Sequence, residues 1–173
     1  MPDQSDIIIR SLTPADEPFL WEMLYQALYV PEGADPFPRD ILRRPEISRY
    51  VQDWGRPDDL GFVAVSNESL SPVGATWIRL LIGENKGYGY VDKTTPELTI
   101  AVVPDYRGCG VGTKLLTHLM AEAKTRYHAV SLSVSADNPA LRLYQRSGFE
   151  VIATSGNSFT MIKKWLREPN NLL

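Results

Sequence analysis

A glycine-rich turn between an apolar strand and an amphipathic helix constrains the fold of this chain most strongly. Residues 97–103 read Glu-Leu-Thr-Ile-Ala-Val-Val and are apolar on both faces of a strand, which is typical of a central strand covered on both sides. Residues 112–127 follow with apolar side chains at helical spacing, namely Leu115, Leu116, Leu119, Met120 and Ala123. The turn that joins them, residues 104–114, reads Pro-Asp-Tyr-Arg-Gly-Cys-Gly-Val-Gly-Thr-Lys. This order places the positive end of a helix dipole and unpaired backbone N–H groups at the turn, which suits a pyrophosphate.

Three phosphate-binding motifs compete for this turn. The Walker A motif requires Gly-Lys followed by Ser or Thr, but here Thr113 separates Gly112 from Lys114. The dinucleotide motif requires a third glycine at the position of Thr113. The pattern that fits is Arg-x-x-Gly-x-Gly, carried by Arg107, Gly110 and Gly112. On these residues alone, a glycine turn without a ligand is the alternative.

The remaining sequence alternates short strands and helices. Period-two and β-branched runs predict strands over residues 7–10, 61–66, 73–81, 130–134, 149–153 and 159–165. Helical spacing predicts helices over residues 16–29, over 39–54 with an interruption before Pro45, and over 138–147, which begins at Asn138-Pro139 and ends at Gly148. Antiparallel strands come first and a β-helix-β unit follows, which indicates an α+β protein with a mixed sheet.

Length and composition limit the class of protein. The 173 residues are enough for one ordinary domain with its own core. With 18 Lys and Arg against 21 Asp and Glu, the net charge is −3, which argues against a nucleic-acid binder. The single cysteine, Cys109, rules out an internal disulfide, and no signal peptide or membrane span is expected. We therefore expect a cytoplasmic protein with no nucleic-acid or membrane partner.

The segment around Arg107, Gly110 and Gly112 resembles the acetyl-CoA signature of the GCN5-related N-acetyltransferases, the GNAT family. The resemblance extends over residues 7–165 and is specific over residues 97–149. It implies an α+β fold with a mixed, mostly antiparallel sheet of about seven strands, a central splayed parallel strand pair and about four helices on both faces. It also implies that residues 1–173 form a single acyl-CoA N-acyltransferase domain, which moves the acetyl group of acetyl-CoA directly onto a primary amine in a ternary complex.

By this resemblance, acetyl-CoA would lie between residues 98–103 and 130–134. The backbone of Val102 and Val103 would pair with the pantetheine arm. Asn138 would contact the same arm, although helix capping alone explains this asparagine equally well. The pyrophosphate would lie against the turn, where the resemblance assigns cofactor binding to Arg107, Gly108, Cys109, Gly110, Val111, Gly112 and Thr113. No catalytic role is expected for the Cys109 thiol, because direct transfer needs no nucleophile from the protein.

The resemblance also implies two catalytic residues. Tyr144 matches the tyrosine that commonly protonates the departing thiolate, although a tyrosine on this helix could serve packing alone. Glu97 stands where many GNAT proteins place the base that deprotonates the amine, with Asp92 a weaker candidate and an exposed acidic residue at a strand end the alternative. The donor to the oxyanion would be the backbone N–H of Val102 or Val103.

The acceptor site would be formed by the first two helices, the loop between them and residues 154–158. Trp21, Tyr25 and Tyr29 lie at helical spacing and could form one wall for a cationic amine, although the same stripe suits core packing. These residues do not separate a polyamine from an amino acid, an antibiotic or a protein lysine. A small-molecule amine is the preferred acceptor; a protein N-terminus or lysine and a non-catalytic acetyl-CoA-binding module are the alternatives.

Two further expectations concern metals and assembly. His118 and His128 have no partner at ligand spacing, so no metal site is expected. Many GNAT proteins pair through their late strands, which implies a possible homodimer, with residues 159–165 as the exposed edge.

Overall fold

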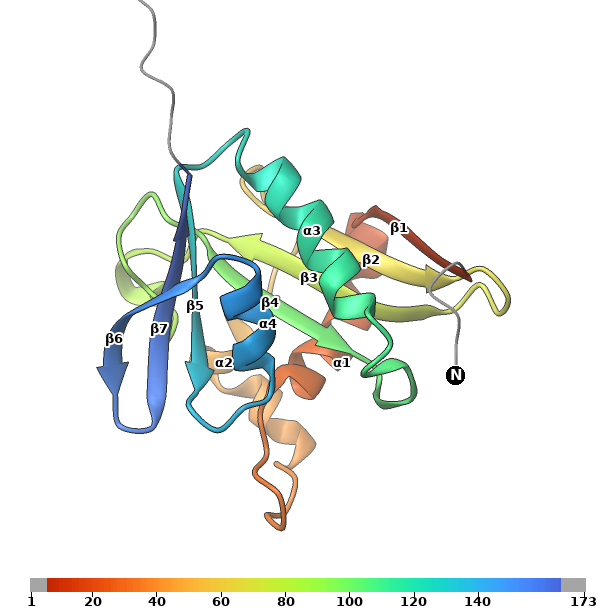
Figure 1. Cartoon of the computed structure of the whole chain (residues 1–173), viewed down its shortest axis with the longest axis horizontal. Coiled ribbons are helices and arrows are strands. Elements are labelled where there is room, and N and C mark those ends of the chain that lie inside the picture. Colours follow the sequence, from red (N-terminus) through yellow and green to blue (C-terminus); the bar gives the residue numbers. More distant parts are fainter. Residues whose placement is uncertain (1–5, 166–173) are drawn as a thin grey trace, which may run out of the picture.

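The computed structural model describes residues 6–165, which form a seven-stranded sheet in the order β1-β2-β3-β4-β5-β7-β6 (Figure 1). The strands are β1 (Ile7–Ser11), β2 (Leu60–Ser66), β3 (Pro72–Arg79), β4 (Glu97–Val102), β5 (Ala129–Ser135), β6 (Glu150–Ser155) and β7 (Ser158–Lys164). The α-helices are α1 (Glu17–Ala27), α2 (Pro45–Ser48), α3 (Val111–Ala123) and α4 (Ala140–Arg146). Short 3-10 turns are η2 (Pro14–Asp16), η3 (Arg39–Arg43), η4 (Gly83–Asn85) and η5 (Pro104–Tyr106).

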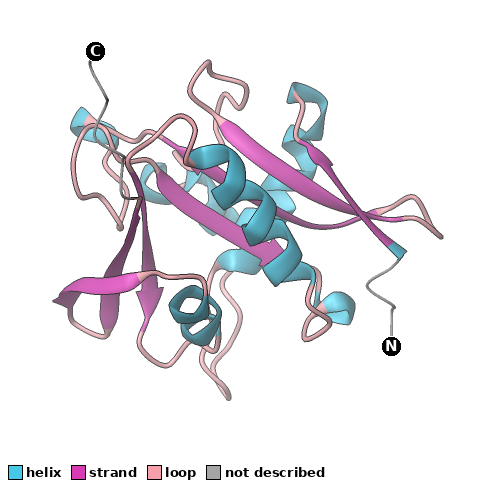
Figure 2. Cartoon of the chain, turned by 45° about the horizontal axis from the view of Figure 1, so that its top comes forward, coloured by secondary structure: helices cyan, strands magenta, loops and turns pink. Residues whose placement is uncertain are grey.

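The parallel pair β4 and β5 is joined at one point and then diverges. Every other neighbouring pair in the sheet is antiparallel, whereas β4 and β5 share only the register pair Glu97↔Ser131. There the Ser131 N–H donates to the Pro96 carbonyl at 3.0 Å. Figure 2 shows β5, β6 and β7 set apart from the other strands beyond this point. The predicted mixed sheet with a splayed parallel pair is therefore confirmed.

Both faces of the sheet are covered by helices, because the central strands are apolar on both sides. Leu98 packs in the core beneath α3 and α4, together with Ile78 and Leu116. Ala101 belongs instead to the core beneath α1 and α2, together with Trp77. Figure 1 shows α3 and α4 in front of the sheet and α1 and α2 behind it. The alternation of β4 between the two cores explains why this segment is apolar at successive positions.

Two predictions about secondary structure need correction. The predicted interruption before Pro45 is present, because Arg44 is extended with ψ 130°, but the residues on either side form η3, the four-residue α2 and turns instead of a helix over residues 39–54. The predicted exposed edge over residues 159–165 is wrong, since β7 pairs with β5 along its whole length and lies between β5 and β6. Met161 and Ile162 of β7 are buried, whereas all six residues of β6 are exposed. The edge strand at this end of the sheet is therefore β6, and β1 is the edge strand at the other end.

Candidate active site

The turn before α3 has the backbone geometry of an anion-binding loop. Gly108 and Gly110 have φ of 72° and 83°, a left-handed conformation that glycine adopts without strain. The Lys114 N–H donates to the Gly110 carbonyl at 3.1 Å, so the first N–H groups of α3 precede this bond and have no acceptor within the helix. These donors come from Val111, Gly112 and Thr113. The turn therefore presents N–H groups and the positive helix end together.

The Arg107 side chain is committed to the scaffold. Its Nε donates to the Val102 carbonyl at 3.0 Å, and its Nη2 donates to Gln26 of α1 at 3.0 Å. The guanidinium thus ties the end of β4 to α1 and fixes the start of the turn. Cys109 is the residue before Gly110 in the Arg-x-x-Gly pattern. It is partly exposed, and its thiol lies 3.5 Å from the Arg107 carbonyl oxygen.

The backbone of Val103 is not available to a cofactor, which corrects one expectation. Its N–H donates to the Val73 carbonyl at 2.8 Å, and its carbonyl accepts from the Tyr106 N–H at 3.0 Å. In an antiparallel ladder the backbone groups of successive residues point to opposite sides. Because Val103 bonds toward β3, Val102 points toward the gap between β4 and β5. Of the two valines, only Val102 keeps an N–H directed at the gap.

A cavity of about 140 Å³ opens where β4 and β5 diverge. Glu97, Asn138 and Tyr144, which the sequence suggested for catalysis or cofactor contact, all lie on its wall. Its remaining lining comes from both faces of the sheet: Leu24, Ala27, Leu28, Ile47, Tyr50, Tyr88, Leu98, Thr99, Ile100, Ser133 and Val134. The fold thus brings residues from α1, the segment after α2, β4, β5 and α4 to one place.

Tyr144 is buried, and its hydroxyl makes no hydrogen bond to the described residues. Its ring packs edge-on against Phe149, with centroids 6.0 Å apart, and the residue is 8% exposed. Within residues 6–165 its phenol makes no hydrogen bond, so the hydroxyl is open to a partner in the cavity. Burial raises the pKa of Tyr144, which keeps the phenol protonated at neutral pH.

Glu97 is a buried carboxylate with three hydrogen-bond donors. Oε1 accepts from the Gly89 N–H at 2.8 Å and from the Tyr50 hydroxyl at 3.1 Å, and Oε2 accepts from the Gly87 N–H at 2.9 Å. Burial raises the pKa of Glu97, while these N–H groups, the Tyr50 hydroxyl and the charge of Arg49 act in the opposite direction. The side chain is 2% exposed, so the expected alternative of an exposed acid at a strand end does not hold.

Asn138 caps α4 and also lines the cavity. Its Oδ1 accepts from the Ala140 N–H at 2.9 Å. The neighbouring Asp137 carbonyl accepts from the Tyr29 hydroxyl at 3.1 Å, which joins the segment after α1 to the loop between β5 and α4. The predicted capping role is therefore present, and the same residue borders the cavity.

The aromatic residues expected to wall the acceptor pocket lie elsewhere. Trp21 packs against the core beneath α1, and the Tyr25 hydroxyl donates to the Phe37 carbonyl at 2.7 Å. Together with Tyr29 they lie outside the cavity lining, which α1 contributes through Leu24, Ala27 and Leu28 instead. Trp21 and Tyr25 lie on α1 and Tyr29 follows its end, but none of the three lines this cavity.

Tyr50 and Tyr88 line the cavity and were not expected from the sequence. Tyr50 stood in a segment predicted as an ordinary helix. Tyr88 lies between β3 and β4, and the alternation of residues 87–90, Gly-Tyr-Gly-Tyr, is the available signal in the sequence. Glycine on both sides of an aromatic residue indicates a backbone in close contact with its surroundings.

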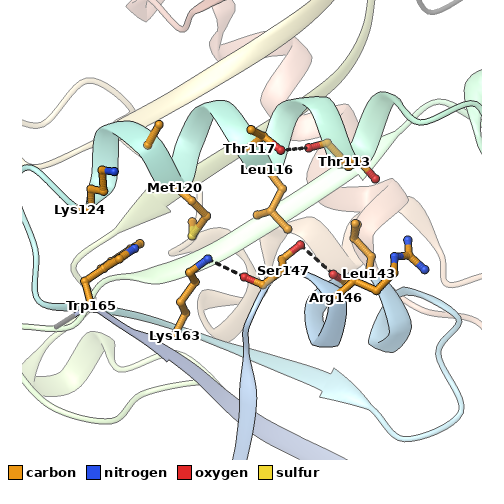
Figure 3. A pocket seen from close by; sticks show the side chains of 11 residues that line it. Thr113, Leu116, Thr117, Met120, Lys124, Leu143, Arg146, Ser147, Lys163 and Trp165 are labelled. Atoms are coloured by element: carbon orange, nitrogen blue, oxygen red, sulfur yellow. Dashed lines mark hydrogen bonds between the residues drawn. The ribbon is translucent and has the colours of Figure 1, made fainter.

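A second cavity, of about 440 Å³, forms a groove between α3, α4 and the end of β7 (Figure 3). It begins at Thr113 in the first turn of α3 and continues to Trp165. Lys124, Arg146 and Lys163 give it positive charge, and no carboxylate lines it among the described residues. Lys163 donates to the Ser147 carbonyl at 2.5 Å, and its pKa is lowered by burial and by the charge of Lys124.

Two absences apply to residues 6–165 alone. No cluster of three or more His, Cys, Asp or Glu side chains within them could hold a metal ion. No helix formed by these residues is both long and apolar enough to cross a bilayer.

Comparison with known proteins identifies the family. The acetyltransferase (GNAT) family model matches residues 20–149. The chain therefore belongs to the GNAT family of acetyl-CoA-dependent N-acetyltransferases, and acetyl-CoA is its co-substrate. The splayed strands and the glycine turn fit this co-substrate, because they provide a gap for an extended arm and N–H groups for a pyrophosphate.

Several curated relatives are similar over most of the chain. The 5-NmdU N-acetyltransferase of Pseudomonas phage PaMx11 is 29% identical over 135 residues, which are 73% of this chain and 91% of the relative. The N-alpha-acetyltransferase 50 of Danio rerio is 27% identical, covering 81% of this chain and 73% of the relative. The mycothiol acetyltransferase of Arthrobacter sp. is 26% identical over 86% of this chain, which spans only 43% of that relative.

Solved structures agree on the fold. The PaiA N-acetyltransferase of Thermoplasma acidophilum, determined in complex with coenzyme A, matches with a TM-score of 0.65 at 20% identity, covering 92% of this chain and 99% of that one. The ribosomal-protein-S18-alanine N-acetyltransferase of Escherichia coli matches with a TM-score of 0.64 at 23% identity, covering 96% and 99%.

Proposed function

We propose that this chain transfers the acetyl group of acetyl-CoA directly onto the primary amine of a small molecule, within a ternary complex. The observation that carries the proposal is the position of Glu97 and Tyr144 on the wall of one cavity at the fork of β4 and β5. Bound acetyl-CoA supplies an activated acetyl thioester. A base and an acid that face the same space can serve the proton transfers that amine acetylation requires, from the nitrogen and to the sulfur.

The cofactor-binding residues follow from the backbone. The N–H groups of the turn and of Val111, Gly112 and Thr113 would hold the pyrophosphate, and Asn138 would contact the pantetheine arm. The Val102 carbonyl already accepts from Arg107, so the one N–H of Val102 would bond the thioester end of acetyl-CoA. The groove that starts at Thr113 would receive the nucleotide end, whose phosphates are complementary to Arg146, Lys124 and Lys163.

Glu97 is proposed as the base that accepts a proton from the incoming ammonium group. A carboxylate whose pKa is raised by burial holds a proton more readily than an exposed one, which improves its match to an amine. The amine nitrogen then forms a bond to the acetyl carbon as the carbon–sulfur bond breaks. The Val102 N–H would stabilise negative charge on the carbonyl oxygen.

Tyr144 is proposed as the acid that protonates the departing sulfur. Its buried phenol has no competing hydrogen-bond partner among the described residues and is protonated at neutral pH, so it can donate to a thiolate that forms beside it. The nitrogen loses two protons and the sulfur gains one. Glu97 takes the first proton from the ammonium group, and the second passes from the new amide nitrogen to the Tyr144 phenolate that is left after the sulfur is protonated. The reaction thus yields an amide, a thiol and one proton held on Glu97.

A small-molecule acceptor is favoured by the size of the cavity. A volume of about 140 Å³ is small, and the Tyr29–Asp137 hydrogen bond joins two segments beside it. A protein N-terminus is the second candidate acceptor, because one relative is the N-alpha-acetyltransferase 50 of Danio rerio.

The test is calorimetric titration with acetyl-CoA, followed by a panel of small amines and short peptides with detection of the released thiol. Binding with thiol release on small amines is expected. Release on peptides alone would replace the proposal with a protein acetyltransferase, and binding without release on any amine would indicate a non-catalytic module.

A further inference from the structure

The turn at residues 87–90 is held against the site by the side chains that surround the fork. The Gly87 and Gly89 N–H groups donate to the Glu97 carboxylate, and the Tyr88 N–H donates to the Tyr50 hydroxyl at 2.8 Å. On the other side, the Ser131 hydroxyl donates to the Gly89 carbonyl at 2.7 Å. Every residue from 87 to 89 is thus fixed through its backbone, so the turn has one defined position.

Two positions of this turn have no room for a side chain. A Cβ on Gly87 would overlap Glu97 Oε1 and the Tyr50 hydroxyl. A Cβ on Gly89 would lie 2.7 Å from the Leu132 carbonyl carbon and 2.9 Å from the Ser133 nitrogen. The turn can therefore present only the side chains of its two tyrosines.

The two tyrosines differ in what they contact. Tyr90 lies beneath the ammonium group of Lys86, 4.6 Å from its ring centroid, and is not part of the cavity lining. Tyr88 lines the cavity and is nevertheless 61% exposed. A large aromatic ring that borders the site and still faces solvent has uncovered surface that a ligand can cover.

One wall of the acceptor side is apolar. Leu24, Leu28 and Ile47 supply the wall beneath α1 and α2. Among the described lining residues, Glu97 is the one carboxylate, and there is no Lys, Arg or His. A second ammonium group would therefore have no partner, and neither would a carboxylate or a phosphate on the acceptor.

We propose that Tyr88 determines acceptor specificity and that the acceptor is a monoamine carried on an aromatic or otherwise flat apolar body. This inference rests on the proposed function and names its substrate class. The ring of Tyr88 covers one face of the acceptor, the aliphatic side chains of α1 and α2 cover the other, and the amine points to Glu97. Polyamines, free amino acids and amino sugar phosphates are poor acceptors on this basis.

The test compares primary amines of similar length on the purified full chain. Phenethylamine is expected to have a kcat/KM at least about tenfold above that of putrescine, since stacking and the absent second carboxylate act in the same direction. Tyr88→Ala is expected to raise the KM for phenethylamine about tenfold and to leave the KM for acetyl-CoA unchanged. Tyr88→Phe is expected to restore the parent value, because the ring and not the hydroxyl makes the contact.

Tyr90→Ala is the matched control, since it removes a tyrosine from the same turn outside the cavity. Equal effects of Tyr88→Ala and Tyr90→Ala on the KM for phenethylamine would overturn the inference, as would a preference for putrescine. Either result leaves acetyl transfer intact and so leaves the proposed function standing. A chain that transfers acetyl to no amine would instead remove the proposed function.

Discussion

At the scale of single residues, Glu97 combines a structural and a proposed chemical task. Its carboxylate accepts three hydrogen bonds that position residues 87–89, and the same carboxylate borders the cavity. Burial raises its pKa, so the folded state binds this proton more tightly than the unfolded chain does. Binding of this proton therefore stabilises the folded state. The stabilisation is fully present below the pKa that Glu97 has in the unfolded chain, and it is lost as the pH rises through the higher pKa that Glu97 has in the folded state.

Glu97→Gln should change both activity and its pH dependence. We expect kcat/KM to fall by about 10²- to 10⁴-fold, because an amide cannot accept the proton. In the parent protein the rate should rise with pH as Glu97 ionises, at a pH above the ordinary value of about 4.3, and this rise should be absent in the variant. Rate profiles between pH 4 and 9, with thermal melts across the same range, measure both effects. An unchanged acidic limb in Glu97→Gln would assign the base to another group.

Tyr144→Phe removes one hydroxyl from a packed aromatic ring. We expect kcat to fall by about 10²-fold or more, with the KM for acetyl-CoA nearly unchanged, because the acid acts on the departing sulfur and not on binding. Steady-state kinetics measure this, with Tyr90→Phe as the control outside the cavity. If kcat stays at the parent value, Tyr144 serves packing against Phe149 alone.

At the scale of elements, the first turn of α3 contains a glycine that the fold does not require. Gly112 is helical without a positive φ, and an added Cβ would lie an ordinary 3.4 Å from Leu143. Alanine is the better helix former by about 1 kcal/mol. We propose that a ligand approaches the backbone closely at this glycine.

Gly112→Ala should therefore separate binding from stability. We expect an unchanged or higher melting temperature together with acetyl-CoA binding weakened by about tenfold, since a methyl group would stand beside the pyrophosphate donors. Thermal melts and calorimetry on the same sample measure the two quantities. Parent-like affinity in a stable variant would argue against the pyrophosphate at this turn. Gly110→Asp is the less selective test, because its left-handed φ of 83° strains any side chain.

The segment after α2 is held to the sheet by a buried ion pair. Asp59 accepts from Arg79 Nε at 3.0 Å and Nη2 at 2.8 Å, and both side chains are at most 2% exposed. Asp59→Asn would leave the Arg79 charge buried without a counter-ion, so we expect a loss of about 3–5 kcal/mol in the free energy of unfolding. Urea denaturation measures it. Asp58→Asn, at an exposed neighbouring position, should stay within about 0.5 kcal/mol of the parent.

Secondary structure was predictable from the sequence where the local hydrophobic pattern matches the packing in the fold. The predictions were wrong where the two differ. The amphipathic stripe of α3 and the doubly apolar β4 are readable because one helix face and two strand faces are each buried. Helical spacing predicts a longer helix over residues 39–54. The break at Arg44-Pro45 leaves only short turns on either side of it. The order of β6 and β7 is set by which strand pairs with β5, a long-range choice that no local pattern contains.

At the scale of the whole molecule, the candidate site is assembled from segments far apart in sequence. Tyr144, Asn138 and the glycine turn were recognisable because each lies in a local motif. Tyr50 and Tyr88 were missed because their roles depend on the contact of residue 50 with residue 88 and of both with Glu97. Such contacts arise only when the turn at residues 87–90 folds over the fork.

The homodimer remains a prediction, and β6 is the edge available to it. All six of its residues are exposed, including the apolar Val151 and Ile152. If copies pair through this edge, Val151→Lys should shift the mass measured by light scattering toward that of a single chain. A single-chain mass for the parent protein at all concentrations would remove the prediction.

A continuous sheet separates molecules bound on one face from those bound on the other. Here β4 and β5 diverge beyond the pair Glu97–Ser131, which leaves a gap through the sheet. The groove along α3 and α4 approaches this interruption from one side, and the apolar wall of α1 with residues 47–50 approaches it from the other. Two substrates that arrive from opposite sides do not obstruct each other. Neither has to leave before the other enters, so double-reciprocal plots at several fixed acceptor concentrations should intersect, and the free thiol product should compete with acetyl-CoA but not with the amine.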